Sequence, residues 1–122
     1  MTTLFKRVTP AQKFHITKRK IAKFLGIAES MVREVEKWPY VIYVHRSDRG
    51  GQFISYRKLC EWKNAVACQI QKCCTWEDWQ QLWNAIRIDR RKHYKQYENS
   101  LLQFWQQIWD NRRDALPITP PF

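Results

Sequence analysis

The pattern of hydrophobic and polar positions changes along the chain, and its first part has the spacing of helices. Thr17 is expected to cap a helix over Lys18–Leu25, in which hydrophobic residues recur at steps of three and four. Gly26 then supplies the backbone freedom that a tight turn needs. A second helix is expected over Glu29–Lys37, because its valines are three residues apart and the chain reaches Pro39 directly afterwards.

The next part has a composition typical of β-structure. Residues 40–46 are rich in β-branched and aromatic types and predict a strand. Residues 47–51 end in two glycines and predict a turn, and Gln52–Ser55 predicts the return strand. A helix should begin at Ser55 or Tyr56. One face of that helix carries Leu59, Trp62 and Val66.

The last part is expected to be mostly helical, because neither Gly nor Pro occurs between Gly51 and Pro117. Thr75 is expected to cap the helix that follows it. The hydrophobic positions have a mean spacing near a heptad, which favours long helical structure through Asp114. A bend between two helices at the charged run Asp89–His93 is the alternative. The hydrophobic seam consists of Trp76, Trp79, Trp83, Ile86, Tyr97, Leu101, Phe104 and Ile108.

The distribution of charge divides the chain. The net charge is +11, and residues 1–74 hold fifteen of the 22 Lys and Arg but only five of the 11 Asp and Glu. A basic half joined to a near-neutral half indicates a polyanion-binding module followed by an assembly module. The expected organisation is a DNA-binding domain over residues 1–74, a helical dimerisation region over residues 75–116, and an extended tail over residues 117–122.

The two expected N-terminal helices carry the packing pattern of a helix-turn-helix. In such a unit two short helices cross over a shared core, which requires small and buried residues at fixed steps. Ala22, Gly26, Val32 and Val35 match these steps. Together with the hairpin and the helix after it, they predict a mainly α fold with a small β-hairpin wing. The fold class is a winged helix-turn-helix followed by a long C-terminal helical dimerisation region.

The stretch from Ile16 to Trp62 resembles the DNA-binding domains of the MerR and excisionase families. The resemblance rests on the Leu-Gly-Ile corner at residues 25–27, the Val-Arg pair at residues 32–33, a short wing over residues 41–54, and Leu59 with Trp62. In place of the Arg-Tyr-Tyr-like run usual in MerR proteins, residues 34–38 read Glu-Val-Glu-Lys-Trp. The resemblance implies a small MerR-type repressor that lacks an effector domain and dimerises through the helix after the wing.

Candidate DNA contacts follow from this geometry. The start and outer face of the second expected helix would reach base edges through Glu29, Ser30, Arg33 and Lys37. Arg33 is the best single candidate, because Arg can bind guanine through two hydrogen bonds. Contacts with the DNA backbone are expected from Lys18, Arg19, Lys20 and Lys23 on the first helix and from Arg46 and Arg49 on the wing.

The sequence carries no enzyme signature. The three His are scattered, and the four Cys lack the paired spacing of common zinc sites. No enzyme activity, cofactor or metal is therefore expected. No run of 18 apolar residues is present and the N-terminus lacks a signal-peptide core, so no membrane partner and a cytoplasmic location are expected.

Three functions compete at this point. The leading expectation is a sequence-specific regulator of transcription that binds double-stranded DNA, a dimeric repressor whose homodimer interface is the hydrophobic seam. The first alternative is an excisionase-like architectural or recombination accessory protein, with a recombinase or transposase as a further partner. The second alternative is a helical protein-interaction adaptor in which the basic half is incidental.

Overall fold

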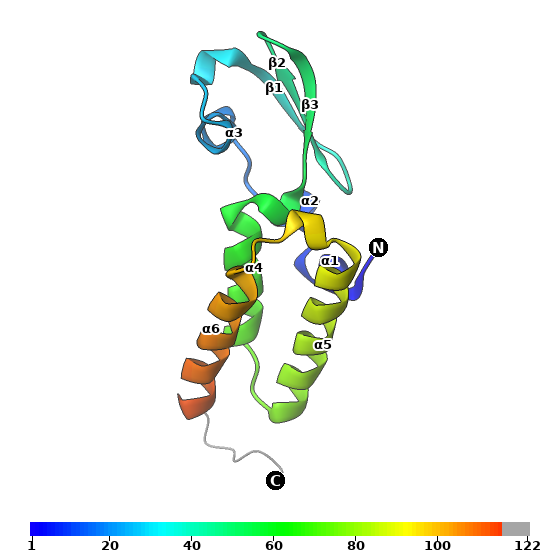
Figure 1. The fold of residues 1–122 in the computed structure, drawn as a ribbon, viewed down its shortest axis with the longest axis vertical. Coiled ribbons are helices and arrows are strands. Elements are labelled where there is room, and N and C mark those ends of the chain that lie inside the picture. Colours follow the sequence, from blue (N-terminus) through cyan, green and yellow to red (C-terminus); the bar gives the residue numbers. More distant parts are fainter. Residues whose placement is uncertain (116–122) are drawn as a thin grey trace.

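The chain forms two lobes in the computed structural model, which describes residues 1–115. One lobe is helical, and the other holds a sheet with one helix beside it (Figure 1). The chain begins in the helical lobe with α1 (Thr3–Val8) and the short α2 (Pro10–Lys13). The Thr2 hydroxyl caps α1 by accepting from the Phe5 amide. Leu4, Phe5 and Val8 bury one face of α1, so the basic N-terminus contributes to the core.

The expected first helix is confirmed as α3 (Lys18–Leu25). The Thr17 hydroxyl caps it by accepting from the Lys20 amide at 3.1 Å. Gly26 ends it with φ 70°, a left-handed conformation that glycine adopts without steric cost. Ile21 and Ala22 of α3 are buried, and α3 contacts β1 of the sheet.

The expected second helix over Glu29–Lys37 is wrong. Its first residues form a 3₁₀ turn, η1 (Glu29–Met31), and the rest is a strand, β1 (Val32–Lys37). A bulge shifts the register between Val32 and Glu34. The extra residue resets the in-and-out alternation, so Val32 and Val35 both reach the inner face although they are three residues apart. The bulge in β1 therefore explains why the two valines have the three-residue spacing that is typical of a helix.

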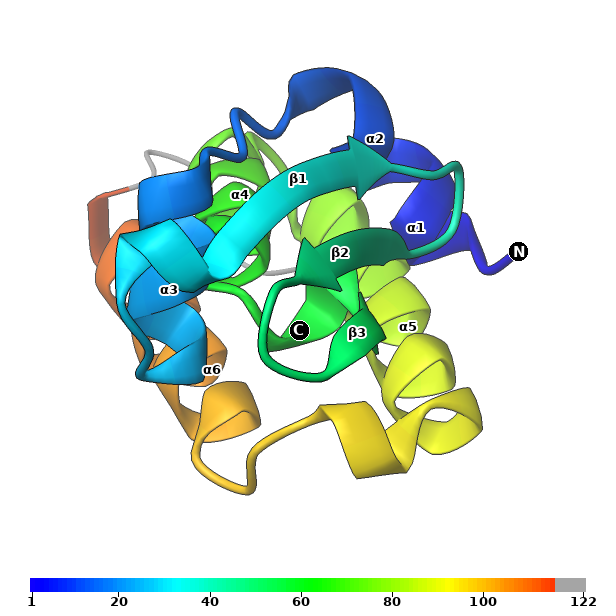
Figure 2. The same ribbon diagram turned by 90° about the horizontal axis from the view of Figure 1, so that it is seen from above.

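The expected hairpin is present as β2 (Ile42–Arg46) and β3 (Gly50–Ile54). With β1 it makes a three-stranded antiparallel sheet in the order β1-β2-β3. Figure 2 looks down on this sheet, with α3 beside it. Ile42, Val44 and Ile54 are buried on its inner face. The fold thus combines helices with a small sheet, as expected, but the sheet has an additional strand and no helix-turn-helix forms in residues 17–38.

The helix expected after the hairpin is confirmed as α4 (Cys60–Gln71), which follows a 3₁₀ turn, η2 (Tyr56–Lys58). Trp62 and Val66 are fully buried on one face of α4, and Leu59 is buried just before it. Because α4 lies between α6 and α1, it is the central helix of the helical lobe.

The C-terminal region is a helical hairpin and not one long helix. It consists of α5 (Trp76–Lys92), a 3₁₀ turn, η3 (Tyr94–Gln96), and α6 (Leu101–Ala115). Thr75 caps α5, as expected, by accepting from the Asp78 amide. The chain reverses near the charged run that was the alternative site of a bend. The tail expected over residues 117–122 lies outside the described residues.

Much of the hydrophobic seam is buried inside this chain. Trp79 is 3% exposed, Ile86 0% and Tyr97 9%, and the other seam residues pack partly buried against the same core. Trp79 on α5 stacks on Trp109 of α6 with ring centroids 4.7 Å apart. The argument for a homodimer assumed that one chain could not cover the seam. The chain buries Trp79, Ile86 and Tyr97 itself, so that argument now applies only to the five seam residues that stay partly exposed.

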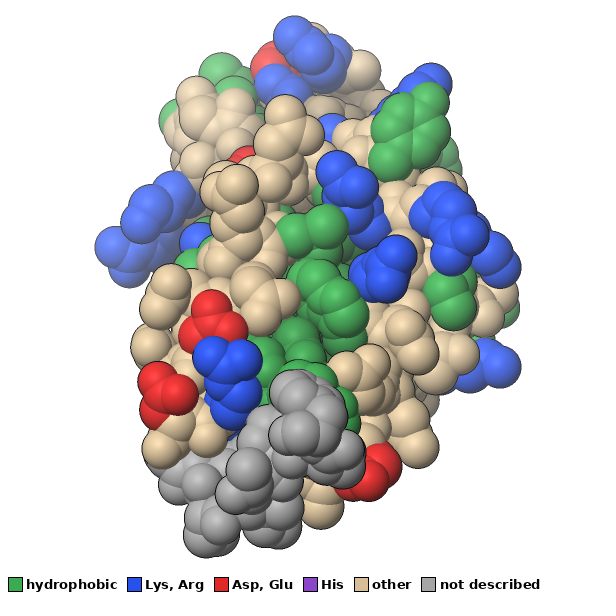
Figure 3. All heavy atoms as spheres, turned by 60° about the horizontal axis from the view of Figure 1, so that its bottom comes forward, with side chains coloured by type: hydrophobic (Ala, Val, Ile, Leu, Met, Phe, Trp, Pro, Cys, Tyr) green, Lys and Arg blue, Asp and Glu red, His purple; other side chains and the backbone are tan. Residues whose placement is uncertain are grey.

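The core is also continuous across residue 74, the expected domain boundary. One cluster of buried residues joins α1, the sheet and α4 to α5 and α6. Hydrophobic side chains still form a strip on the surface of the helical lobe, with Lys and Arg side chains beside it (Figure 3). Within residues 1–115, none of the helices has the length and apolar character needed to cross a membrane.

Candidate nucleic-acid interface

The four residues expected to read bases do not share a helix face. Glu29 and Ser30 are exposed in η1. Arg33 is exposed at the bulge of β1. The Lys37 ammonium donates to the Phe14 carbonyl oxygen at 2.9 Å and so ties β1 to the segment before α3. These positions therefore offer no single surface that would enter a major groove.

The cations expected on the first helix are exposed on α3. Lys18, Arg19, Lys20 and Lys23 all face solvent. The Lys20 ammonium donates to the His15 carbonyl oxygen at 2.7 Å, which orients that side chain along the start of α3. A cluster of cations on one helix is a surface for a polyanion only if neighbouring elements extend it.

The two arginines expected on the wing differ. Arg46 is 8% exposed, and its guanidinium donates to both carboxylate oxygens of Asp48 and to the Gln52 amide oxygen. The hydrogen bonds with Asp48 raise the pKa of Arg46 and lower the pKa of Asp48. Arg46 thus braces the hairpin, whereas Arg49 in the following turn is exposed.

A groove between the two lobes gathers cations that are far apart in sequence. It consists of two hollows of about 400 Å³ and about 380 Å³, which share Phe24, Leu59 and Cys60 along their walls. Five lysines line them, and we call this surface the lysine groove. They are Lys20 and Lys23 of α3, Lys58 of η2, Lys63 of α4 and Lys95 of η3.

The lysine groove is electropositive on balance. Glu61 and Glu98 are the acidic residues along its described walls, against the five lysines. Arg57 also lines it, but its charge is neutralised by Asp89. The Lys63 ammonium lies 4.1 Å from the centre of the Phe104 ring of α6, a cation–π contact. Concave surfaces of one charge sign concentrate an oppositely charged ligand.

Sequence reasoning found Lys20 and Lys23 but missed Lys58, Lys63 and Lys95. These three lie in separate elements of the chain, and no local spacing relates them. The excess of Lys and Arg in residues 1–74 was the available signal, and it could not locate a groove whose far wall is η3.

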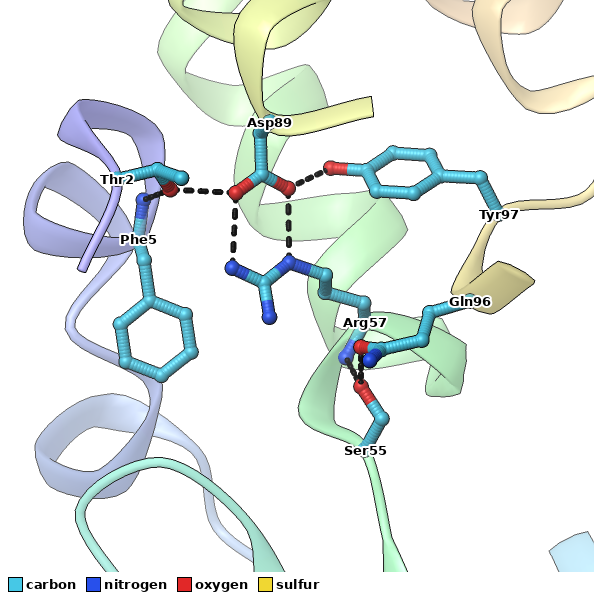
Figure 4. Close-up of polar contacts among 7 residues, drawn as sticks. All are labelled: Thr2, Phe5, Ser55, Arg57, Asp89, Gln96 and Tyr97. Carbon is cyan, nitrogen blue, oxygen red and sulfur yellow. Dashed lines mark hydrogen bonds and ion pairs between the residues drawn. The ribbon is translucent and has the colours of Figure 1, made fainter. Parts of the chain in front are cut away.

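A buried polar network fixes the walls of the groove (Figure 4). The Asp89 carboxylate on α5 is 0% exposed. It accepts from Nε and Nη2 of Arg57 in η2, both at 2.8 Å, and from the hydroxyls of Thr2 and Tyr97. The Ser55 hydroxyl donates to the Gln96 side chain nearby. Four segments that are distant in sequence therefore meet at one carboxylate.

The pKa values of this network follow from burial and hydrogen bonding. Burial by itself would raise the pKa of Asp89, but the hydrogen bonds from Arg57, Thr2 and Tyr97 outweigh it and hold that pKa below its usual value. Burial and the adjacent carboxylate raise the pKa of Tyr97. Asp89 is therefore a structural anion, and it has no access to a ligand.

The outer face of the sheet is the second unusual surface. It carries Trp38, Tyr43 and Phe53, whose ring centroids lie 5.0–5.3 Å apart. Gly51 lets the Tyr43 ring lie across β3, since a Cβ at that position would overlap the phenol oxygen. Trp38 and Phe53 are 40% and 57% exposed. Aromatic rings therefore dominate one part of this face, whereas lysines dominate the groove.

The same face holds three side chains that could bind a metal ion. Within the described part of the chain, donor atoms of Glu34, Glu36 and His45 all lie within 4.8 Å of one another. His45 and Glu36 are in direct contact, and the Trp38 indole donates to the other Glu36 oxygen at 3.4 Å. The hydrogen bond with His45 lowers the pKa of Glu36. The Glu36 carboxylate is thus held between the His45 ring and the Trp38 indole.

Comparison with protein families, with characterised proteins and with solved structures finds no match for this chain. The resemblance of residues 16–62 to the MerR and excisionase families thus stays a hypothesis carried by the sequence motif. The site has to be interpreted from its own geometry and charge.

Proposed function

We propose that this protein binds nucleic acid, with the phosphate backbone held by the lysine groove and the exposed basic face of α3. The observation that carries the proposal is the convergence of five lysines from α3, η2, α4 and η3 on one concave surface. A run of charged residues along a single helix is usually just the face that the helix exposes to solvent, and it does not by itself indicate a binding site. Lysines brought together from four elements raise the electrostatic potential at one place.

No groove lysine forms an ion pair with a described residue, although the Lys20 ammonium donates to a backbone carbonyl and the Lys63 ammonium lies on the Phe104 ring. In the described residues, the Lys and Arg side chains that form ion pairs are Arg46, Arg57 and Arg113. Arg57, the guanidinium closest to the groove, is committed to Asp89. The groove lysines therefore supply the positive charge there, and a polyanion would release the counterions that surround them.

The biological role that we propose for this binding is the regulation of transcription, or an accessory function in recombination or transposition. It takes its support from the basic N-terminal half. Sequence-specific readout would have to use exposed side chains such as Arg33 and Arg49, because the helix expected to enter the major groove is a strand. Footprinting on genomic DNA tests this form: protection of a defined site supports it, and uniform protection restricts the role to non-specific binding.

The binding proposal is tested with two charge-matched triple variants. Lys23→Gln, Lys58→Gln and Lys95→Gln together remove three exposed cations of the groove. Lys6→Gln, Lys13→Gln and Lys72→Gln remove three exposed cations elsewhere, so both proteins lose the same net charge. Affinity is measured by fluorescence anisotropy over a series of salt concentrations.

Each phosphate contact contributes roughly 0.7–0.9 to the slope of log affinity against log salt. The groove triple is expected to reduce the slope by about 2–3 and to weaken binding at every salt concentration. The control triple should change the slope by less than about 1. Equal losses in both triples would show that binding depends on net charge and would overturn the assignment to the groove.

A further inference from the structure

We infer that the lysine groove takes single-stranded nucleic acid and that the Phe24 ring provides the surface on which a base stacks. This inference rests on the proposed function and names its substrate. Phe24 lies on α3 between the cations of the two hollows and lines both of them. Phe24 is 43% exposed, and the other exposed residues of α3 are all charged. It is therefore the one apolar residue on the exposed face of this helix.

The size of the groove favours a single strand over a duplex. Its hollows of about 400 Å³ and about 380 Å³ fall in the range of small-molecule sites, roughly 300–1,000 Å³, and can hold nucleotide units. The bases of a B-form duplex are paired and stacked inside the double helix, so a duplex offers the hollows its backbone and groove edges but no free base face. A single strand can run across the two adjoining hollows with its phosphates on the lysines and its bases turned inward.

The chemistry of Phe24 completes the site. Proteins that bind single strands combine a basic groove with aromatic rings, because every base has a flat face that stacks. Among the described residues, the rings of Trp38, Tyr43 and Phe53 are already packed against one another. Phe24 is in no ring pair within residues 1–115, is 43% exposed and lines both hollows.

Charge distinguishes the groove from the aromatic face of the sheet. Glu34 and Glu36 lie on the outer face of the sheet, where they would repel phosphates. The groove opposes its two carboxylates with five lysines. A single strand is therefore attracted to the groove, although the sheet presents more aromatic surface.

The test compares Phe24→Ala with Phe53→Ala, a matched loss of an exposed phenylalanine on the sheet. The probes are an oligothymidylate of about 12 nucleotides, a length within the range that single-strand-binding modules cover, and a duplex of the same length. Circular dichroism melting first establishes that both variants are folded. Affinities are then measured by anisotropy at one low salt concentration.

The unmodified protein is expected to bind the single strand more tightly than the duplex. Phe24→Ala should weaken single-strand binding by roughly fivefold to a hundredfold, the range for losing one stacked base, and leave duplex binding unchanged. Phe53→Ala should change neither. The inference would be overturned if only Phe53→Ala lost affinity for the single strand. It would also be overturned if Phe24→Ala bound each probe as tightly as the unmodified protein does.

The lysine variants separate this inference from the proposed function. If the groove triple weakens single-strand binding but Phe24→Ala does not, the groove holds phosphates and the stacking assignment fails alone. If neither the groove triple nor Phe24→Ala affects binding of either probe, the proposed function fails as well. Phe24→Leu keeps an apolar side chain and removes the ring, so it should behave as Phe24→Ala if stacking is the cause.

Discussion

Replacing Asp89 with Asn should destabilise the protein more than replacement of any surface carboxylate. The change keeps the shape of the side chain but removes the charge that neutralises Arg57, which is 8% exposed. Leaving one member of a buried ion pair without its partner costs about 3–5 kcal/mol. The hydroxyls of Thr2 and Tyr97 also donate to this carboxylate, and an amide offers them one oxygen in place of two. We therefore expect a loss of about 4 kcal/mol.

That loss is large on the scale of a small protein, whose unfolding free energy is about 5–15 kcal/mol. Urea unfolding at pH 7 measures it, with tryptophan fluorescence as the probe. Trp62, Trp105 and Trp109 are almost fully buried and should report global unfolding. At a slope of about 2 kcal/mol per molar urea, the midpoint should fall by about 2 M.

Asp110→Asn is the matched control. Asp110 pairs with Arg113 at 3.7 Å on an exposed part of α6, and such pairs contribute about 0.3–0.5 kcal/mol. If Asp89→Asn cost no more than this control, the carboxylate would not be the buried anion that the structure shows. The reasoning about how η2, α5 and η3 are held together would then be refuted.

The pH dependence supplies an independent check. The folded-state pKa of Asp89 is lowered, so its contribution to stability is present above the unfolded value of about 3.9 and is lost as the pH falls through the folded value. The difference in unfolding free energy between the unmodified protein and Asp89→Asn should therefore become smaller only below about pH 4. In Arg57→Met the buried carboxyl loses its cation and its pKa should rise, so that variant should gain stability toward acid pH.

Further predictions concern the turn, the sheet and the assembly. Gly26→Ala should cost about 1 kcal/mol in urea unfolding, because the residue has φ 70° but nothing lies within 4 Å of a new Cβ. Gly51→Ala should instead displace the Tyr43 ring, which would appear as a loss of near-UV circular dichroism from the aromatic cluster with a smaller change in stability. Truncation after Cys74 removes α5 and α6 from the shared core, so the fragment should fail to show cooperative unfolding. Sedimentation at micromolar concentration should give a particle of 15.0 kDa, because the chain itself buries Trp79, Ile86 and Tyr97 of the seam. A particle of about twice that mass would support the homodimer.

Local chemistry explains which elements could be predicted. Thr17 and Thr75 cap their helices through their own hydroxyls, and Gly26 ends α3 through its own backbone freedom. The hairpin likewise depends on β-branched residues and a turn that are adjacent in sequence. These features were predicted because the residues that cause them lie within a few positions of one another.

The strand β1 shows where this reasoning stops. A bulged strand and a helix can both place Val32 and Val35 on one face, so the spacing alone cannot separate them. Pairing with β2 decides the outcome, since it supplies hydrogen-bond partners for the backbone of this segment. The assignment of Arg33 and Lys37 to DNA bases depended on the helix and lost its geometric basis with it.

The candidate site could be predicted only in its chemistry. The excess of Lys and Arg in the first 74 residues indicated a polyanion, and it follows from the sequence by counting. The position of the groove depends on Lys95 in η3 lying beside Lys58 and Phe24, which requires the chain to reverse between α5 and α6.

The sequence by itself determined the capped helices, the hairpin, the helical character of the C-terminal region and the sign of the charge. Only the tertiary structure decided that β1 is a strand, that part of the tryptophan seam is buried within this chain, and that five lysines line one groove. The physical reason is the range of the interactions. Caps and turns act over a few residues, whereas strand pairing, burial and the Asp89 network join segments up to 87 positions apart, and their energies are gained only when the whole chain has folded.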